Sequence, residues 1–228
     1  MDFAKTFEDQ LTELQTKFPQ RNYDVTMLPE SLARAYREEI MMPALISLID
    51  RSVCKPGQTD AGKFEDASEV ILKWTIGSEF KMPVVAQSRT LTIAGQSVRV
   101  RDISLTMPQG DIDEPWLTIR IENQIKSIVF ECKNYVTTSK LTKEEIFQVY
   151  EYLHPKTYGK LGVILTRYGK DSISPSARSA IFRLAQDDYK IVVLGDDDMK
   201  DLINEFVKTG SCANFFAVHN EKARPQAG

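Results

Sequence analysis

The stretch Ser127-Ile128-Val129-Phe130-Glu131-Cys132-Lys133 largely decides how this chain is interpreted. It begins with the apolar residues of a buried strand and ends with two charged ones. Because side chains alternate along a strand, Glu131 and Lys133 share one face, and Cys132 points to the other, into the core. A carboxylate that can hold a divalent metal, beside an ammonium that can orient water or stabilise a phosphate, suits phosphodiester hydrolysis. Charges that emerge at the end of a buried strand are also more often functional than charges on a solvated face.

The overall composition is that of one globular domain. The chain has 228 residues, of which 42% are hydrophobic and 27% charged, which is enough to bury a substantial core. The net charge of −3 argues against a broadly basic nucleic-acid binder but leaves room for a local basic surface.

The cysteines and the apolar runs indicate where the protein acts. The three cysteines are widely spaced and only two histidines occur, so a structural zinc site is not expected and a reducing cytoplasm fits. The longest apolar run, residues 41–49, contains Pro43 and is too short to span a bilayer. We therefore expect a cytoplasmic protein with no membrane association.

Helical periodicity dominates the first part of the chain. It predicts a helix over residues 2–18, a loop over 19–29 and a second helix over 30–51 with a kink at Pro43. The loop composition of residues 52–62 marks a subdomain boundary. We therefore expect an N-terminal helical region over residues 1–58, packed on the core or appended to it.

The remainder of the chain alternates between helices and strands. Strands are predicted at 83–87, 89–93, 97–106, 126–132, 161–166 and 191–194, with a hairpin turn at 94–96. Helices are predicted at 63–76, 143–153, 174–188 and 196–207. Thr142 and Glu145 fit a capping box at the start of the second of these, and Ser174-Pro175 is a typical start for the third. Residues 107–117 form an irregular excursion. Strands followed by alternating helices and strands indicate an α/β fold with a mixed sheet covered on both faces.

This order resembles the PD-(D/E)xK nuclease superfamily, whose fold is restriction endonuclease-like. The resemblance covers residues 60–195 and consists of a helix, strands that bear an Asp, a strand that ends in Glu-x-Lys, a helix and a further strand. It implies an αβα sandwich with a mixed central sheet over residues 59–220, in addition to the N-terminal helices. Residues 221–228 are expected to be a disordered tail.

The resemblance also implies a set of site residues. Asp102, Glu131 and the backbone carbonyl of Cys132 would hold Mg²⁺, with Mn²⁺ as a substitute. Lys133 would orient or help to deprotonate the attacking water. Glu65 matches the helix glutamate that lies near the metal in many such nucleases, with Glu69 as the alternative.

The next helix adds a further candidate. Gln148, with Tyr152 four residues later, is similar to a Gln-xxx-Tyr element whose glutamine points toward the active site. The family's usual Pro before the Asp is absent here, where Arg101 takes its place, so Asp111 and Asp113 remain alternatives to Asp102 as the ligand.

Simpler structural roles are also open for these residues. Glu131 and Lys133 can form an ordinary ion pair, and Asp102 can pair with Arg99 or Arg101. The run Asp196-Asp197-Asp198 is better explained by a helix N-terminus than by a second metal site. His154 and His219 are expected on the surface or in loops.

The expected function is that of a Mg²⁺-dependent endonuclease that hydrolyses DNA and leaves 5′-phosphates, in restriction or anti-phage defence. It is expected to work as a homodimer or as an effector regulated by a partner. The alternatives are a catalytically silent module that binds nucleic acid or protein, and an RNase on the same fold. Basic residues that cluster near the site in sequence are candidates for phosphate contacts: Arg89, Arg99, Arg101, Lys126, Lys133, Lys140, Lys143, Lys156, Lys160 and Arg167.

Overall fold

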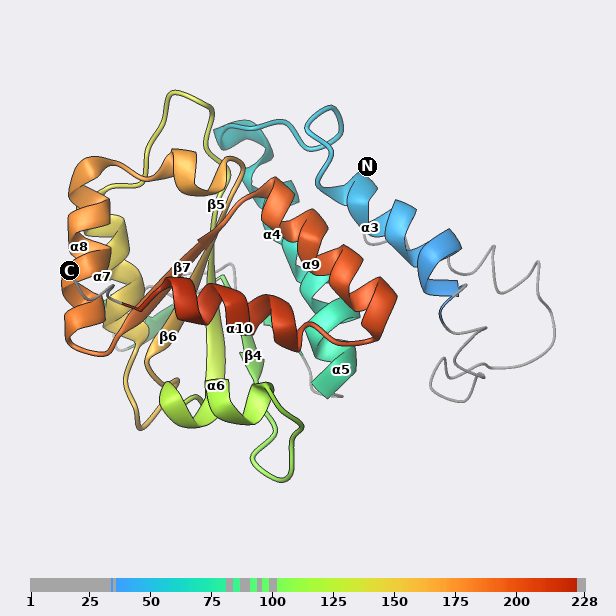
Figure 1. Cartoon of the computed structure of the whole chain (residues 1–228). Coiled ribbons are helices and arrows are strands. Elements are labelled where there is room, and N and C mark those ends of the chain that lie inside the picture. The colour runs from blue at the N-terminus through green and yellow to red at the C-terminus, as the bar shows by residue number, and fades with distance from the viewer. Residues whose placement is uncertain are drawn as a thin grey trace.

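The structure, a computed structural model, describes residue 34, residues 36–80 and residues 102–224 (Figure 1). It also describes the backbone of the strands at 84–86, 91–93 and 96–98. The helix predicted over 2–18 and the loop over 19–29 lie outside the described residues, as do the side chains of Arg89, Arg99 and Arg101.

A mixed five-stranded sheet forms the centre of the molecule. Its strands lie in the order β1-β4-β5-β6-β7; β1, β4 and β5 are antiparallel, whereas β5, β6 and β7 are parallel. The bounds of these strands are Val84–Ala86 (β1), Ile103–Thr106 (β4), Ser127–Lys133 (β5), Leu161–Thr166 (β6) and Lys190–Leu194 (β7). The mixed sheet confirms the α/β prediction and places β5, with its charged end, in the middle.

A separate two-stranded ribbon consists of β2 (Leu91–Ile93) and β3 (Gln96–Val98). Ile93 pairs with Gln96, so the chain reverses close to the predicted hairpin turn, although Gln96 belongs to a strand. The strand predicted over 97–106 is therefore two strands, and Asp102 stands directly before β4.

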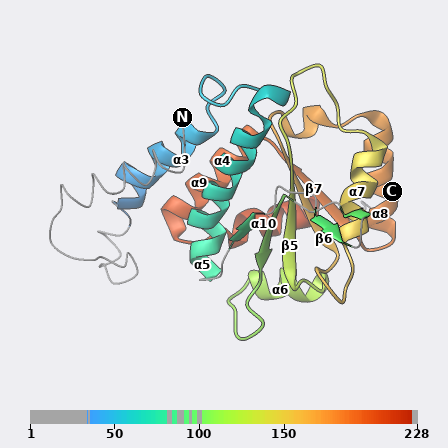
Figure 2. The same ribbon diagram turned by 180° about the vertical axis from the view of Figure 1, so that it is seen from behind.

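Helices cover both faces of the sheet (Figures 1 and 2). One face carries α4, α6, α9 and α10, and the other carries α7 and α8. The helices of the first face are α4 (Ala61–Leu72), α6 (Trp116–Glu122), α9 (Asp196–Thr209) and α10 (Ala213–Lys222). Those of the other face are α7 (Lys143–Tyr152) and α8 (Pro175–Gln186). This three-layer αβα arrangement is the one expected. None of the helices in the described part of the chain is both long and apolar enough to cross a membrane.

The described end of the N-terminal region is packed on the core. A π-helical turn, Arg37–Met41, leads into α3, Met42–Leu48, and Met41 and Leu45 are buried in the same core cluster as α9. The Nε of the buried Arg37 donates a hydrogen bond to the carbonyl of Val207 at 3.0 Å. Pro43 is the second residue of α3, directly after this π-helical turn.

Three α-helices of the described residues were not predicted from the sequence: the single turn α5, Ser78–Phe80, and the longer α6 and α10. Helix α6 occupies the long interval between β4 and β5, part of which was expected to be irregular. Helix α10 extends through Lys222, and beyond it the Nη2 of Arg224 donates a hydrogen bond to Glu122. The expectation of a disordered tail from residue 221 is therefore wrong for residues 221–224, because these residues pack against α6; residues 225–228 lie outside the described residues.

Candidate active site

The end of β5 presents Glu131 and Lys133 on one face of the sheet. Ile128, Phe130 and Cys132 alternate into the core cluster beneath α4 and α9, so the odd-numbered residues face the layer of α7 and α8. The Nζ of Lys133 lies 2.8 Å from Oε1 of Glu131. Glu131 is buried, with 4% of its surface exposed. The predicted shared face and the inward position of Cys132 are thus confirmed.

Asp102 joins this pair from the neighbouring strand. Ile103 pairs with Phe130, so Asp102 lies beside Glu131 where the antiparallel ladder ends. Its Oδ2 accepts a hydrogen bond from the backbone N–H of Cys132 at 2.6 Å. The sheet therefore brings Asp102 next to the Glu-x-Lys strand, a contact between residues far apart in sequence.

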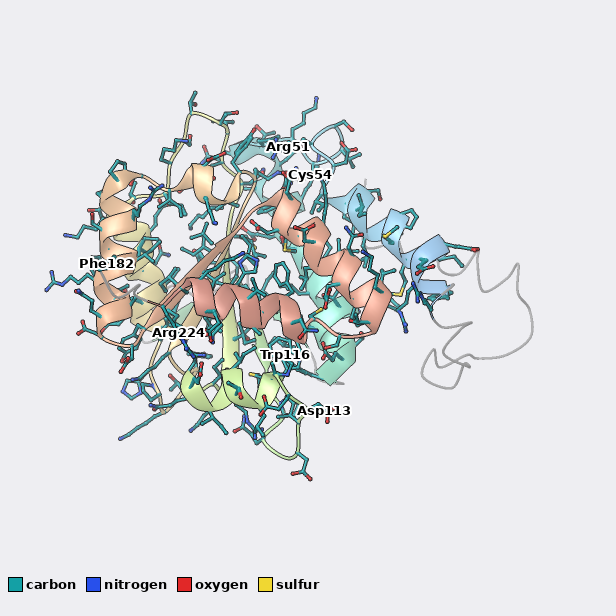
Figure 3. The ribbon with its side chains drawn as sticks, viewed as in Figure 1. Arg51, Cys54, Asp113, Trp116, Phe182 and Arg224 are labelled. Carbon is teal, nitrogen blue, oxygen red and sulfur yellow. The ribbon has the colours of Figure 1, made fainter. Side chains whose placement is uncertain are left out.

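The alternative carboxylates lie at the opposite end of the sheet. Thr106, at the end of β4, pairs with Ser127 at the start of β5, so Asp111 and Asp113 follow at the end remote from Glu131. Figure 3 shows Asp113 far from Arg51 and Cys54, which border the other end. Of the three aspartates considered, only Asp102 is near Glu131 and Lys133.

Negative charge accumulates in this partly buried place. Burial raises the pKa of Asp102 to about 6, and the charge of Glu65 adds to the increase, whereas the Cys132 hydrogen bond and Lys133 oppose it. The pKa of Glu65, on α4, is raised by burial and then by the charges of Asp66 and Glu131. The pKa of Glu69 is also raised by burial, but the charges that affect it are those of Asp66 and Lys73 and not those of the site. Of the two glutamates of α4, Glu65 is therefore the one that interacts with Glu131 and Lys133.

Lys133 remains an ammonium in this setting. Burial alone lowers its pKa, but the charge and hydrogen bond of Glu131 outweigh burial, and Asp102 and Glu145 add to the increase. The net effect is a raised pKa. Lys133 can therefore donate hydrogen bonds and stabilise an anionic phosphate, and it is poorly suited to take up a proton at neutral pH.

Glu145 is a contributor that sequence reasoning missed. It completes the capping box of α7, where its Oε2 accepts the N–H of Thr142 at 2.8 Å, and its Oε1 accepts the hydroxyl of Tyr135. Through these bonds α7 is attached to the segment that follows Lys133. The capping box was recognised in the sequence, but only the fold shows that its glutamate also lies in the field of Lys133.

Gln148 is one turn further along α7 and is half-buried. Within the described part of the chain, no hydrogen bond joins it to Asp102, Glu131 or Lys133. Its position is compatible with the predicted role but adds no support to it.

Asn134 holds a loop against the end of β5. Its side-chain Nδ2 donates hydrogen bonds to the backbone carbonyls of Lys55 at 3.0 Å and Gly57 at 2.7 Å. The backbone carbonyl of Asn134 accepts a hydrogen bond from the N–H of Gly57 at 2.8 Å. Gly57 has a φ of +125°, a conformation that favours glycine. This loop leads into α4, so the contacts position the helix that carries Glu65.

The acidic run at the start of α9 serves the fold. Asp196 is buried, and its carboxylate contacts Arg51 Nε at 2.7 Å and Arg167 Nε at 3.3 Å. Asp198 accepts the N–H of Gly195 at 2.7 Å, and Asp197 pairs with Lys200. The prediction of a helix N-terminus is confirmed, but the buried ion pairs of Asp196 were not foreseen.

The two histidines differ in their surroundings. His154 is exposed, as predicted, and its Nδ1 accepts the N–H of Lys156. His219 lies within α10, where it packs on the ring of Phe215 and its Nε2 is 3.9 Å from Asp198. Burial lowers its pKa. The prediction of a surface or loop position is therefore wrong for His219.

The donors at the site fit a divalent cation in kind. Carboxylate oxygens and a backbone carbonyl are the ligands that Mg²⁺ prefers, and the raised pKa of Asp102 reflects crowded, desolvated negative charge that a cation would relieve. Among the described residues, no three His, Cys, Asp or Glu side chains are already arranged to hold a metal ion. Glu131 contacts Lys133 and Asp102 contacts the Cys132 N–H instead.

Comparison with protein-family models and with curated proteins finds no match to this chain. Among solved structures, the chain is similar to that of restriction endonuclease FokI, with 11% sequence identity and a TM-score of 0.42. The similarity covers 75% of this chain and 28% of the FokI chain. A likeness this distant carries no argument about activity.

Proposed function

We propose that this protein is a metal-dependent nuclease that hydrolyses phosphodiester bonds. The observation that carries the proposal is the meeting of Asp102, Glu131 and Lys133 at the end of β5. Asp102 contacts the backbone of Cys132 at 2.6 Å, and Lys133 contacts Glu131 at 2.8 Å. Burying one carboxylate and partly burying a second carboxylate and an ammonium is costly, so their meeting at the end of the central strand indicates use in chemistry.

Each residue has a role that follows from its surroundings. Asp102, Glu131 and the carbonyl of Cys132 would hold the cation, and Glu65 would approach from α4. The bound Mg²⁺, or Mn²⁺ in its place, would act as Lewis acid and template. Lys133, held as an ammonium, would orient the attacking water and stabilise charge on the phosphate. Gln148 is kept as a lesser candidate for positioning the water or the metal.

The finer assignments depend on the resemblance in motif order. They are cleavage of DNA within the strand to leave 5′-phosphates, a role in restriction or anti-phage defence, and action as a homodimer or under a regulatory partner. The free cysteines of the described chain, Cys54, Cys132 and Cys212, are all buried, which is compatible with a cytoplasmic location.

A substrate panel tests this proposal. Supercoiled plasmid and single-stranded RNA are incubated with the protein in Mg²⁺, in Mn²⁺ and in EDTA. We expect nicked and linear plasmid with Mg²⁺, no product in EDTA and no product from Glu131→Gln. Glu151→Gln, an exposed carboxylate on α7, is the matched control and should cut like the wild type.

The other outcomes identify the alternatives. Cleavage of RNA alone would replace DNA by RNA as the substrate. If the wild type cuts neither substrate with either metal, the enzymatic assignment fails and a silent binding module remains.

A further inference from the structure

The fold separates the basic residues that are close in sequence to the site. Lys126, Lys156 and Lys160 precede β5 and β6, at the end of the sheet remote from Glu131. Lys140 follows β5, and Arg167 follows β6, at the end that bears the candidate site. The first three are therefore too remote to be the candidate phosphate contacts next to the site, because the two ends of parallel strands lie at opposite edges of the sheet.

Three loops meet at the edge that bears the site: residues 51–57, 134–141 and 167–173, here termed the three-loop edge. Asn134 joins the first two loops through its bonds to Lys55 and Gly57. The Oγ1 of Thr137 lies 3.1 Å from the hydroxyl of Tyr168, which joins the second loop to the third. Figure 1 shows the chain before α4 and the loop after β5 at this edge.

Further contacts make the three-loop edge one continuous surface. The guanidinium of Arg51 stacks 4.2 Å from the ring centre of Tyr168. The Nζ of Lys140 donates to the carbonyl of Asp171, and the N–H of Leu141 donates to the carbonyl of Ser172 at 2.6 Å. The loops therefore support one another and present a surface whose shape is largely set before any ligand binds.

The charge of this surface is opposite to that of the chain as a whole. Its basic residues are Arg51, Lys55, Lys140, Arg167 and Lys170, whereas Asp171 is its single acidic residue. Arg51 and the buried Arg167 both pair with Asp196, but Lys55, Lys140 and Lys170 are exposed. The protein carries a net charge of −3, so positive charge is concentrated at the edge next to Lys133.

We propose that the three-loop edge binds the sugar-phosphate backbone of a DNA strand beside the bond to be cut. The inference depends on the proposed function for the choice of DNA. The second loop begins at Asn134, directly after Lys133, so a strand held on this surface runs into the candidate site. Lysine ammonium groups supply contacts that are independent of sequence and sensitive to salt.

Binding without cleavage tests the inference. Fluorescence anisotropy of a labelled duplex is measured in EDTA over a series of salt concentrations. For the double substitution Lys55→Glu/Lys170→Glu we expect affinity at least about tenfold weaker at low salt. We also expect the slope of log affinity against log salt to be less negative by about two, one for each lost phosphate contact.

Lys126→Glu/Lys156→Glu is the matched control, because it changes the net charge equally at the opposite edge of the sheet. This control should keep most of the wild-type affinity and slope. Thermal unfolding of both variants establishes that they are folded. Equal affinity of Lys55→Glu/Lys170→Glu and the wild type, or an equal loss in both double variants, overturns the inference.

The outcome is distinguishable from failure of the nuclease proposal. A protein that binds DNA through the three-loop edge but never cuts it retains this inference and loses the enzymatic one. A protein that cuts DNA while Lys55→Glu/Lys170→Glu binds normally shows the reverse.

Discussion

Replacing Asp102 by Asn measures the electrostatic cost of placing this carboxylate in the candidate site. The folded protein raises the pKa of Asp102 from its ordinary value near 3.8 to about 6, chiefly through burial, and the charge of Glu65 adds to it. The folded state therefore favours the protonated carboxyl. Asn has nearly the same shape and cannot ionise, so it removes the titration and leaves most of the packing in place.

The sign and size of the effect follow from this shift. Below about pH 3, Asp102 is protonated in both the folded and the unfolded chain, and its contribution to stability is highest. As pH rises, the unfolded chain ionises first, and the stabilisation is lost until the folded group also ionises above about pH 6. A shift of about two pKa units corresponds to about 3 kcal/mol. Part of this difference is already lost at pH 4, so relative to Asp102→Asn the wild type should lose about 2 kcal/mol of unfolding free energy between pH 4 and pH 7.

Urea unfolding of both proteins in EDTA at half-unit pH intervals gives this difference directly. Other titrating groups affect both proteins and largely cancel. Adding Mg²⁺ at pH 7 should restore stability to the wild type more than to Asp102→Asn, since the cation favours the ionised carboxylate. A difference between the two proteins that stays constant from pH 4 to pH 7 would refute the reasoning.

Three other substitutions test how the surrounding structure supports the site, each measured by urea unfolding. Arg167→Met leaves the buried Asp196 with one partner fewer and should cost about 3 kcal/mol; a loss under about 1 kcal/mol would contradict a structural role for the pair. Asn134→Ala removes two hydrogen bonds to the loop before α4 and should cost about 2 kcal/mol, whereas an unchanged midpoint would mean that the loop is held by other contacts. Gly195→Ala would place a Cβ 2.5 Å from the N of Gly169 and should cost about 1–3 kcal/mol, and a stable variant would show that the two loops can separate freely.

The parts of the fold with strong local signals were predictable from the sequence. The strand Leu161–Thr166 was predicted with the bounds observed, because a continuous apolar run flanked by polar residues defines a buried strand. The helix that begins at Lys143 was equally clear, because Thr142 and Glu145 form a capping box at its start. Both signals lie within a few residues of the element they predict.

The elements that were missed depend on distant partners. The helix Trp116–Glu122 has no side-chain cap, and Trp116 is held by a hydrogen bond from its indole to Glu79 at 2.8 Å. The buried pair of Arg167 and Asp196 joins two strand ends that no local pattern connects. In the site itself, Glu131 and Lys133 could be grouped from their spacing alone, whereas the proximity of Asp102 follows from the antiparallel register of β4 and β5. The influence of Glu145 on Lys133 likewise depends on how α7 packs on the sheet.

The most direct test of the central proposal is the single-turnover rate of plasmid cleavage in Mg²⁺ for the wild type, Lys133→Met and Lys126→Met. Both substitutions replace an ammonium by an apolar side chain of similar length: Lys133 is the last residue of β5, at the candidate site, and Lys126 directly precedes the opposite end of the strand. We predict that Lys133→Met lowers the rate about 10²–10³-fold, the size expected for losing one charge-stabilising group, and that Lys126→Met leaves it within about twofold of the wild type. Equal rates for Lys133→Met and the wild type would contradict the assignment of this site as the catalytic centre.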